Sequence, residues 1–237
     1  MPLRHSSMPA IVFDLDGTLV ETAPDLHAVL AEVLGEEAVP APSLAAIRHM
    51  VGDGARALLE RALLAAGEPV RSERLERLFG RFLEVYTAEP CRFGHAYPGV
   101  EDTLARLAAA GHPLGVCTNK PQRPSELVLQ ALGLDRWLSA VVGGDALPVR
   151  KPDPAHLAAV LARLGAGHEG AVMVGDSRND VTTARALGIS CVLVSFGYTP
   201  VPARELGADA VIDRFADLPD ALRGLTPPTA SPSRPPA

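Results

Sequence analysis

The sequence has few cysteines, no excess of basic residues and no long apolar run. Its three cysteines, Cys91, Cys117 and Cys191, are spaced too widely for a disulfide framework or a zinc site. Lys and Arg number 22 against 28 Asp and Glu, so the net charge of −6 provides no basic surface for a nucleic-acid backbone. We therefore expect a reducing compartment and no nucleic-acid partner.

No apolar stretch approaches the roughly 20 residues that a membrane-spanning helix needs. The segment from Met1 to Pro9 is short and polar, so we expect no export signal, no membrane partner and a cytoplasmic location. Apolar residues make up 47% of the 237 residues, and charged residues are spread along the chain. This composition is typical of a globular protein with room for one α/β core and a smaller second lobe.

Short apolar runs that end in polar loops recur along the chain and predict buried strands at Ala10–Phe13, Leu114–Cys117, Ala140–Val142, Ala171–Val174 and Cys191–Ser195. Amphipathic helical patterns lie between them, at Val100–Ala110, Ser125–Leu132, Ala155–Leu164 and Asn179–Leu187. Each is followed by a glycine, as is typical of helix C-termini: Gly111, Gly133, Gly165 and Gly188. Because parallel strands need crossover helices, the alternation predicts an α/β fold with a doubly wound, Rossmann-like parallel sheet.

One region interrupts this alternation. From about Ala23 to about Arg92 only helical patterns occur, including 55–66 and 73–86. We interpret residues 23–92 as a helical cap domain, inserted into a catalytic core formed by residues 1–22 and 93–225. Residues 226–237 are rich in proline, serine and threonine and predict a disordered tail.

Two carboxylates, Asp14 and Asp16, directly follow the first predicted strand. An ionised carboxylate is costly to remove from water unless it is paired or binds metal, so the pair indicates a cation or a reaction, with a solvated turn as the alternative. Other polar segments follow later, at Thr118-Asn119-Lys120, Lys151-Pro152-Asp153-Pro154 and Gly175 to Asp180. In a doubly wound sheet ligands bind outside the carboxyl ends of the strands, so these segments are expected to meet in one crevice.

In this order and spacing the segments resemble the four motifs of the haloacid dehalogenase superfamily. Its phosphatases show a DxDG[TV] box, a Thr or Ser after the second strand, a Lys, and a GDxxxD box. The resemblance runs from about Ala10 to about Leu222. It implies a phosphatase that forms a covalent aspartyl-phosphate.

The resemblance also implies a role for each motif residue. Asp14 would be the nucleophile, and Asp16 would protonate the leaving alkoxide and then activate water. Thr118, Asn119 and Lys151 would bind the phosphoryl group, with Thr118 and Lys151 also serving in catalysis. Taken alone, Thr118 is equally consistent with a helix N-cap and Lys151 with an exposed lysine.

A magnesium ion is the cofactor that the resemblance implies. Asp14, the backbone carbonyl of Asp16 and Asp176 would hold it, and Asp180 would orient this metal shell from behind. Hard oxygen ligands suit this cation, and its charge would let the carboxylate approach an anionic phosphate.

Further segments resemble the phosphoglycolate phosphatase family within this superfamily: Leu19 to Leu26, Val51 to Ala55, Phe196-Gly197-Tyr198 and Ala210 to Asp213. The implied substrate is a small molecule, 2-phosphoglycolate. Glu21 stands where Asp is usual and Thr199-Pro200 where Asn and Gly are frequent, so the substrate stays open. The alternatives are another small phosphate, such as a sugar phosphate or pyrophosphate, or a sugar phosphomutase on the same fold.

Two other functions are possible on such a fold. A dehalogenase needs neither Asp16 nor Asp176, and a binding module without turnover is expected to lose Asp14 or Asp16, which are both present.

The carboxylate of phosphoglycolate would need cationic partners. Arg48 and Arg56 flank the Gly52-Asp53-Gly54 turn, so we predict that at least one contacts substrate, with solvated arginines as the alternative. A monomer and a homodimer both remain open.

Overall fold

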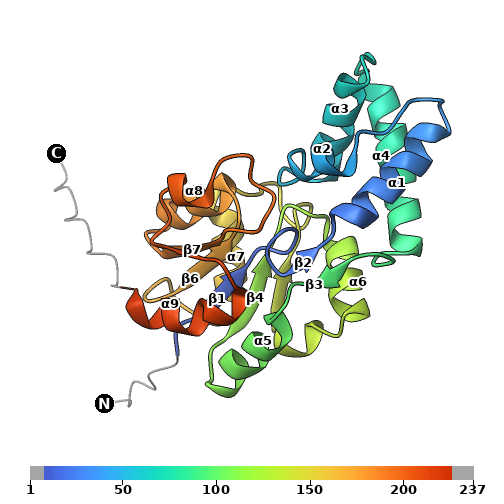
Figure 1. The fold of residues 1–237 in the computed structure, drawn as a ribbon. Coiled ribbons are helices and arrows are strands. Elements are labelled where there is room, and N and C mark those ends of the chain that lie inside the picture. Colours follow the sequence, from blue (N-terminus) through green and yellow to red (C-terminus); the bar gives the residue numbers. More distant parts are fainter. Residues whose placement is uncertain (1–7, 226–237) are drawn as a thin grey trace, which may run out of the picture.

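The computed structural model describes residues 8–225, and the predicted tail at 226–237 lies outside this range. Figure 1 shows a central sheet flanked by helices, with a group of helices to one side. Within the described residues, no helix has the length and apolar character needed to cross a membrane.

A six-stranded sheet forms the centre of the core, in the order β5-β4-β1-β6-β7-β8, and each pair of neighbours is parallel. The strands are β1 (Ile11–Phe13), β4 (Leu114–Cys117), β5 (Ala140–Val142), β6 (Val172–Gly175), β7 (Ser190–Val194) and β8 (Ala210–Ile212). The chain builds outward from β1 in both directions, which confirms the predicted doubly wound sheet. The loop after β1 therefore lies at the switch point, where such sheets bind ligands.

Helices cover both faces of this sheet because the strands are apolar on both sides. In β1, Ile11 and Phe13 belong to one buried cluster and Val12 to the other, as the alternation of side chains along a strand requires. Contacts with the strands come from α5 (Val100–Ala109), α6 (Gln122–Ala131) and α9 (Leu218–Gly224), and from α7 (Pro154–Arg163) and α8 (Arg178–Ala186). Short 3-10 turns occupy Asp135–Trp137, Ala203–Glu205 and Phe215–Asp217.

Four further helices form the group to one side of the sheet in Figure 1: α1 (Ala23–Gly35), α2 (Leu44–Arg48), α3 (Ala55–Ala65) and α4 (Ser72–Ala88). We call this group the cap. The chain enters and leaves the cap through a two-stranded antiparallel ribbon of β2 (Val20–Glu21) and β3 (His95–Ala96). The domain boundaries at residues 22 and 93 stay a prediction.

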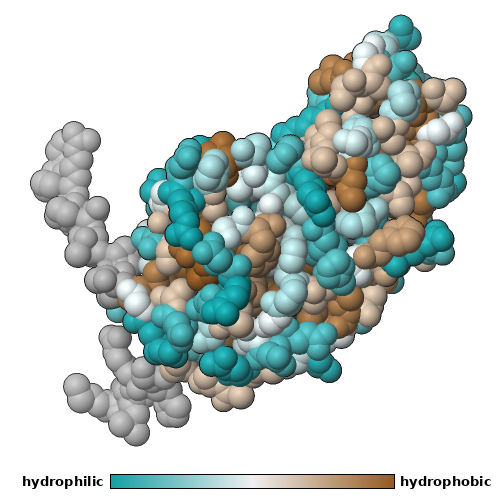
Figure 2. Space-filling view, in the orientation of Figure 1, coloured by the Kyte–Doolittle hydropathy of each residue, from teal (hydrophilic) through white to brown (hydrophobic). Residues whose placement is uncertain are grey.

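Polar and apolar residues are interspersed over the face of the molecule seen in Figure 2. Among the large apolar side chains that the structure describes, only Met8, Leu64 and Phe93 are exposed. These three lie in different parts of the chain, so the apolar side chains of both core and cap are used for internal packing.

Candidate active site

The polar segments predicted from the sequence do meet at the carboxyl edge of the sheet. Asp14 continues β1, and its backbone N–H donates to the carbonyl of Val174 in β6. Gly17 then turns the chain with a φ of +81°, and a Cβ there would lie 2.6 Å from Asp176 Oδ2. This turn therefore requires glycine, and it brings the loop after β1 against the loop after β6.

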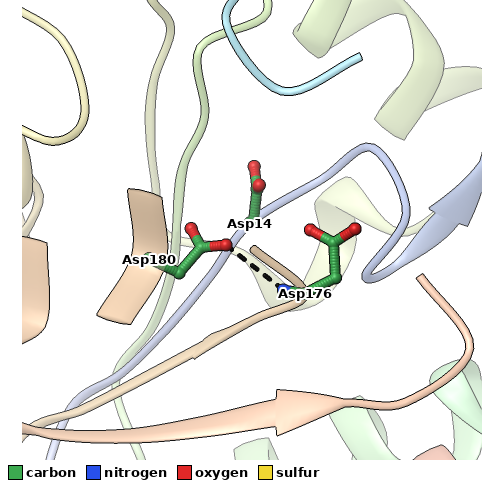
Figure 3. A group of neighbouring side chains, drawn as sticks. All are labelled: Asp14, Asp176 and Asp180. Carbon is green, nitrogen blue, oxygen red and sulfur yellow. Dashed lines mark hydrogen bonds between the residues drawn. The ribbon is translucent and has the colours of Figure 1, made fainter. Parts of the chain in front are cut away.

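Three buried carboxylates, Asp14, Asp176 and Asp180, gather at this edge (Figure 3). One oxygen from each lies within 4.8 Å of the others. The ammonium of Lys151 is 2.9 Å from Asp14 Oδ2 and 2.7 Å from Asp180 Oδ1. With all three carboxylates ionised, the one ammonium leaves a net charge of −2 on side chains that are almost entirely buried. A divalent cation with a preference for oxygen ligands fits this charge and this donor set.

Burial and the neighbouring charges shift the pKa values of two of these carboxylates. Burial raises the pKa of Asp14 to about 6, with Asp180 adding to the increase and Lys151 opposing it. Burial, followed by the charges of Asp180 and Asp14, raises the pKa of Asp176 well above its ordinary value. A cation bound between these groups would stabilise their ionised forms.

Asp180 has protein donors on both of its oxygens. Oδ1 accepts from Lys151, and Oδ2 accepts from the Asp176 N–H at 3.2 Å, the bond dashed in Figure 3, and from Ser177 N–H and Oγ at 3.0 and 2.7 Å. The bond from the Ser177 N–H is one half of a capping box at the start of α8; in the other half the Ser177 side chain accepts from the Asp180 N–H. Asp176 Oδ2 accepts from the Tyr198 N–H at 2.6 Å. Asp180 is thus arranged to hold Asp176 and Lys151 in place.

The Asp16 side chain lies outside this group of three carboxylates. Its Oδ1 accepts from Thr22 Oγ1 at 2.7 Å and from Lys120 Nζ at 3.1 Å. The Asp16 carboxylate therefore does not belong to the acidic cluster and is bonded to Thr22 and Lys120 instead. The contact of its backbone carbonyl with a metal stays a prediction.

The loop after β4 carries the next three polar residues. Thr118 is buried, and its Oγ1 accepts from the Lys120 N–H at 3.2 Å. Asn119, predicted to bind phosphate, donates from Nδ2 to the carbonyls of Gly52 at 2.9 Å and Lys151 at 3.0 Å. In this structure the Asn119 amide therefore ties the cap to the loop that carries Lys151.

Lys120 is a buried residue of the site to which the sequence assigned no role. Burial acts to lower its pKa, but Asp16 and Tyr86 together more than offset this, so the pKa lies above its ordinary value. Its ammonium also lies 4.3 Å from the ring centroid of Tyr86 in α4. No feature of the Thr118-Asn119-Lys120 segment separates this lysine from an exposed one, because its partners come from distant parts of the chain.

The Gly52-Asp53-Gly54 turn of the cap lies against the core. The Gly52 carbonyl accepts from Asn119 and, at 3.3 Å, from Asn179 Nδ2, which also donates to Asp53 Oδ1 at 2.8 Å. Pockets lie on both sides of this turn. The inner pocket is lined by Asp14, Asp16, Leu26, Val51, Gly52, Gly54, Ala55, Leu58, Phe82, Leu83, Tyr86, Thr118, Asn119, Lys120, Pro121 and Pro124.

The outer pocket, of about 380 Å³, contains Asp16 and Asp176 together with two arginines, Arg61 and Arg178. The sequence pointed instead to Arg48 and Arg56. Arg48 pairs with Glu21 at 3.1 Å and Arg56 pairs with Glu76, and neither lines the inner or the outer pocket. A substrate contact for Arg48 or Arg56 stays a prediction. Arg61 and Arg178 could not be singled out, because helical periodicity alone does not show which arginine faces a pocket.

Fold and site together define an α/β protein with a cluster of buried carboxylates at the switch point of a parallel sheet. The chain matches the model of the haloacid dehalogenase-like hydrolases over residues 8–188. It is 48% identical to the phosphoglycolate phosphatase of Caulobacter vibrioides over 211 residues, which cover 89% of each chain. The chain therefore belongs to the haloacid dehalogenase-like hydrolase family.

Solved structures show the same likeness. A predicted phosphoglycolate phosphatase from Haemophilus somnus superposes with a TM-score of 0.84 at 31% identity, over 91% of this chain and 98% of that chain. CbbY from Rhodobacter sphaeroides, solved in complex with phosphate, gives a TM-score of 0.74 at 25% identity, over 91% and 99%. The predicted family and fold are thus confirmed.

Proposed function

We propose that the chain is a phosphoric monoester hydrolase that acts on 2-phosphoglycolate through an aspartyl-phosphate on Asp14. The observation that carries this proposal is the Asp14 carboxylate, held by the Leu15 N–H at 2.7 Å and by Lys151 at 2.9 Å beside two further buried carboxylates. The names of the relatives in Caulobacter vibrioides and Haemophilus somnus support the substrate.

In this mechanism an oxygen of Asp14 attacks phosphorus while the bond from phosphorus to the glycolate oxygen breaks. Asp16 donates a proton to the departing alkoxide and then removes one from the water that hydrolyses the aspartyl-phosphate. Lys151 compensates negative charge on Asp14 and on the phosphoryl oxygens, and the Thr118 hydroxyl donates a hydrogen bond to one of these oxygens. Asn119 positions the loops that carry these groups and is a further candidate for phosphate binding.

The acidic cluster fits Mg²⁺, with Asp14, the Asp16 backbone carbonyl and Asp176 as ligands and Asp180 behind them. When bound, the ion would supply positive charge where two anions must meet. We also propose a cytoplasmic enzyme, because Cys91, Cys117 and Cys191 are all free thiols.

The test is phosphate release by the purified protein, with Mg²⁺, over a panel of 2-phosphoglycolate, sugar phosphates and pyrophosphate. We expect 2-phosphoglycolate to have the highest kcat/KM, and mass spectrometry of an acid-quenched reaction to show one added phosphoryl group on the peptide that contains Asp14. Hydrolysis of none of these compounds would overturn the proposal. Isomerisation of a sugar phosphate without phosphate release would instead assign a phosphomutase.

A further inference from the structure

We infer that Lys120 and Tyr86 form a second anion subsite, which holds the carboxylate of the substrate while the core holds its phosphate. This inference rests on the proposed phosphatase function and specifies its substrate class: small phosphate esters with a second negative group close to the phosphate. The subsite lies in the inner pocket, between the cap and the core.

Lys120 supplies the positive charge of this pocket. Among residues 8–225 it is the only Lys or Arg that lines the inner pocket, which also contains the catalytic carboxylates Asp14 and Asp16. The Lys120 side chain is only 4% exposed, so an anion that enters the pocket meets its ammonium with little intervening water.

The position of this ammonium is fixed from two sides. Its Nζ lies 3.1 Å from Asp16 Oδ1 and 4.3 Å from the ring centroid of Tyr86. A lysine ammonium has three N–H donors, and the contact with Asp16 uses one of them. Lys120 can therefore donate to a ligand without leaving Asp16.

Tyr86 contributes a hydroxyl group. Tyr86 is 1% exposed, it lines the inner pocket, and its hydroxyl has no hydrogen-bond partner within the described part of the chain. Buried polar groups are nearly always hydrogen-bonded, so an unpartnered hydroxyl at a pocket wall points to a ligand. A carboxylate oxygen next to Lys120 is an acceptor for this hydroxyl.

The start of α3 adds donors of the same polarity. Gly54 and Ala55 line the inner pocket, and no side chain caps this helix of 11 residues. The N–H groups of a first helical turn have no partner within the helix, and they carry partial positive charge. They therefore favour an anion in the pocket.

The remaining wall restricts the size and polarity of the ligand. Leu26, Leu58, Phe82 and Leu83 line the inner pocket and offer no hydrogen-bonding side chain. The hydroxyl groups of a sugar would lose their water here without gaining partners, whereas a methylene followed by a carboxylate leaves no polar group unpaired. The subsite thus favours a short anionic leaving group.

The test compares two esters of similar shape, 2-phosphoglycolate and 2-hydroxyethyl phosphate, in which a hydroxymethyl group replaces the carboxylate. The measured quantity is the ratio of their kcat/KM values. We expect Lys120→Met to lower this ratio about tenfold or more, as the loss of a charge-assisted hydrogen bond would. Tyr86→Phe keeps the ring against Lys120 and is expected to lower the ratio about threefold. Arg77→Gln, which removes an exposed positive charge of the cap, is the matched control and should leave the ratio unchanged.

Lys120 also contacts Asp16, so Lys120→Met is expected to slow both esters to some extent. An equal loss on both, with no change of the ratio in Tyr86→Phe, would overturn the subsite and assign Lys120 to Asp16 alone. If Lys120→Met does not fold, the ratio in Tyr86→Phe decides. A wild-type protein that hydrolyses both esters equally refutes the subsite but keeps the phosphatase, whereas hydrolysis of neither ester refutes the proposed function itself.

Discussion

Replacement of Asp14 by asparagine is expected to abolish turnover and, without metal at neutral pH, to stabilise the fold. The loss of turnover follows from the role of the carboxylate, because an amide cannot form the acyl phosphate. The gain in stability follows from burial, because the ionised Asp14 carboxylate has been removed from water. The attraction of Lys151 does not fully offset this loss, and the charge of Asp180 adds to it. Asparagine is nearly isosteric and removes the charge of Asp14.

The size of the gain follows from the pKa of Asp14, which burial raises from 3.8 to about 6. The folded state binds the proton of the Asp14 carboxyl more tightly than the unfolded chain does. The stability that this proton gives the wild type is therefore fully present below about pH 4 and is lost as the pH rises through about 6. A difference of about two pH units corresponds to about 3 kcal/mol. At pH 8 the ionised Asp14 therefore costs the metal-free protein about 3 kcal/mol of unfolding free energy, which asparagine avoids.

The assay is urea unfolding in EDTA, at several pH values between about 4 and 8, of the wild type, Asp14→Asn and the control Asp213→Asn. Asp213 is an exposed carboxylate paired with Arg204, so its variant should follow the wild type throughout. His156, whose pKa burial lowers to about 4, loses its stabilising effect as the pH falls from about 6.5. It is present in all three proteins, so its contribution cancels in the differences between them.

We expect the stability difference between Asp14→Asn and the wild type to grow from a few tenths of a kcal/mol near pH 4 to about 3 kcal/mol at pH 8. Mg²⁺ should then raise the stability of the wild type more than that of the variant. A difference that does not change with pH, or a variant less stable than the wild type at pH 8, would refute the account of the acidic cluster. Turnover above about a hundredth of the wild-type rate would refute Asp14 as the nucleophile.

Three further predictions concern the same site. EDTA should stop phosphate release and Mg²⁺ should restore it, while Ca²⁺, with its larger and looser oxygen shell, should inhibit; full activity in Ca²⁺ would contradict this. Asp16→Asn should slow esters with poor leaving groups far more than activated aryl phosphates, and equal slowing of both would exclude its role as the acid. Gly17→Ala should raise the Mg²⁺ concentration needed for half-maximal activity about tenfold or more, because the added Cβ would lie 2.6 Å from Asp176 Oδ2. An unchanged Mg²⁺ requirement would show that the turn at Gly17 does not position Asp176.

The sequence determined the core fold, the helical character of the cap and the meeting of the main motifs. Apolar strands alternating with amphipathic helices specify a parallel sheet. The carboxyl ends of parallel strands share one edge of the sheet, so the sequence places Asp14, Thr118 and Asp176 together at that edge. The glycines predicted after four helices all have positive φ, because this helix ending depends on local geometry. β2 and β3 were not predicted, since strands of two residues are too short for a periodicity to show. β8 was not predicted either, although it has three residues, as many as the predicted β5.

Only the tertiary structure decided how the cap meets the core. Helical periodicity places Tyr86 on the apolar face of α4, but not against Lys120 of a core loop. In the same way the sequence could not show that Arg48 is paired with Glu21, or that the Asn119 amide donates to Gly52 in the cap. Each of these contacts joins residues distant in the chain, and which side chains face the pocket depends on the packing of one lobe against the other. Local sequence therefore determined which residues carry the proposed chemistry of phosphate transfer, whereas the proposed selection of the leaving group depends on an arrangement that only the folded chain creates.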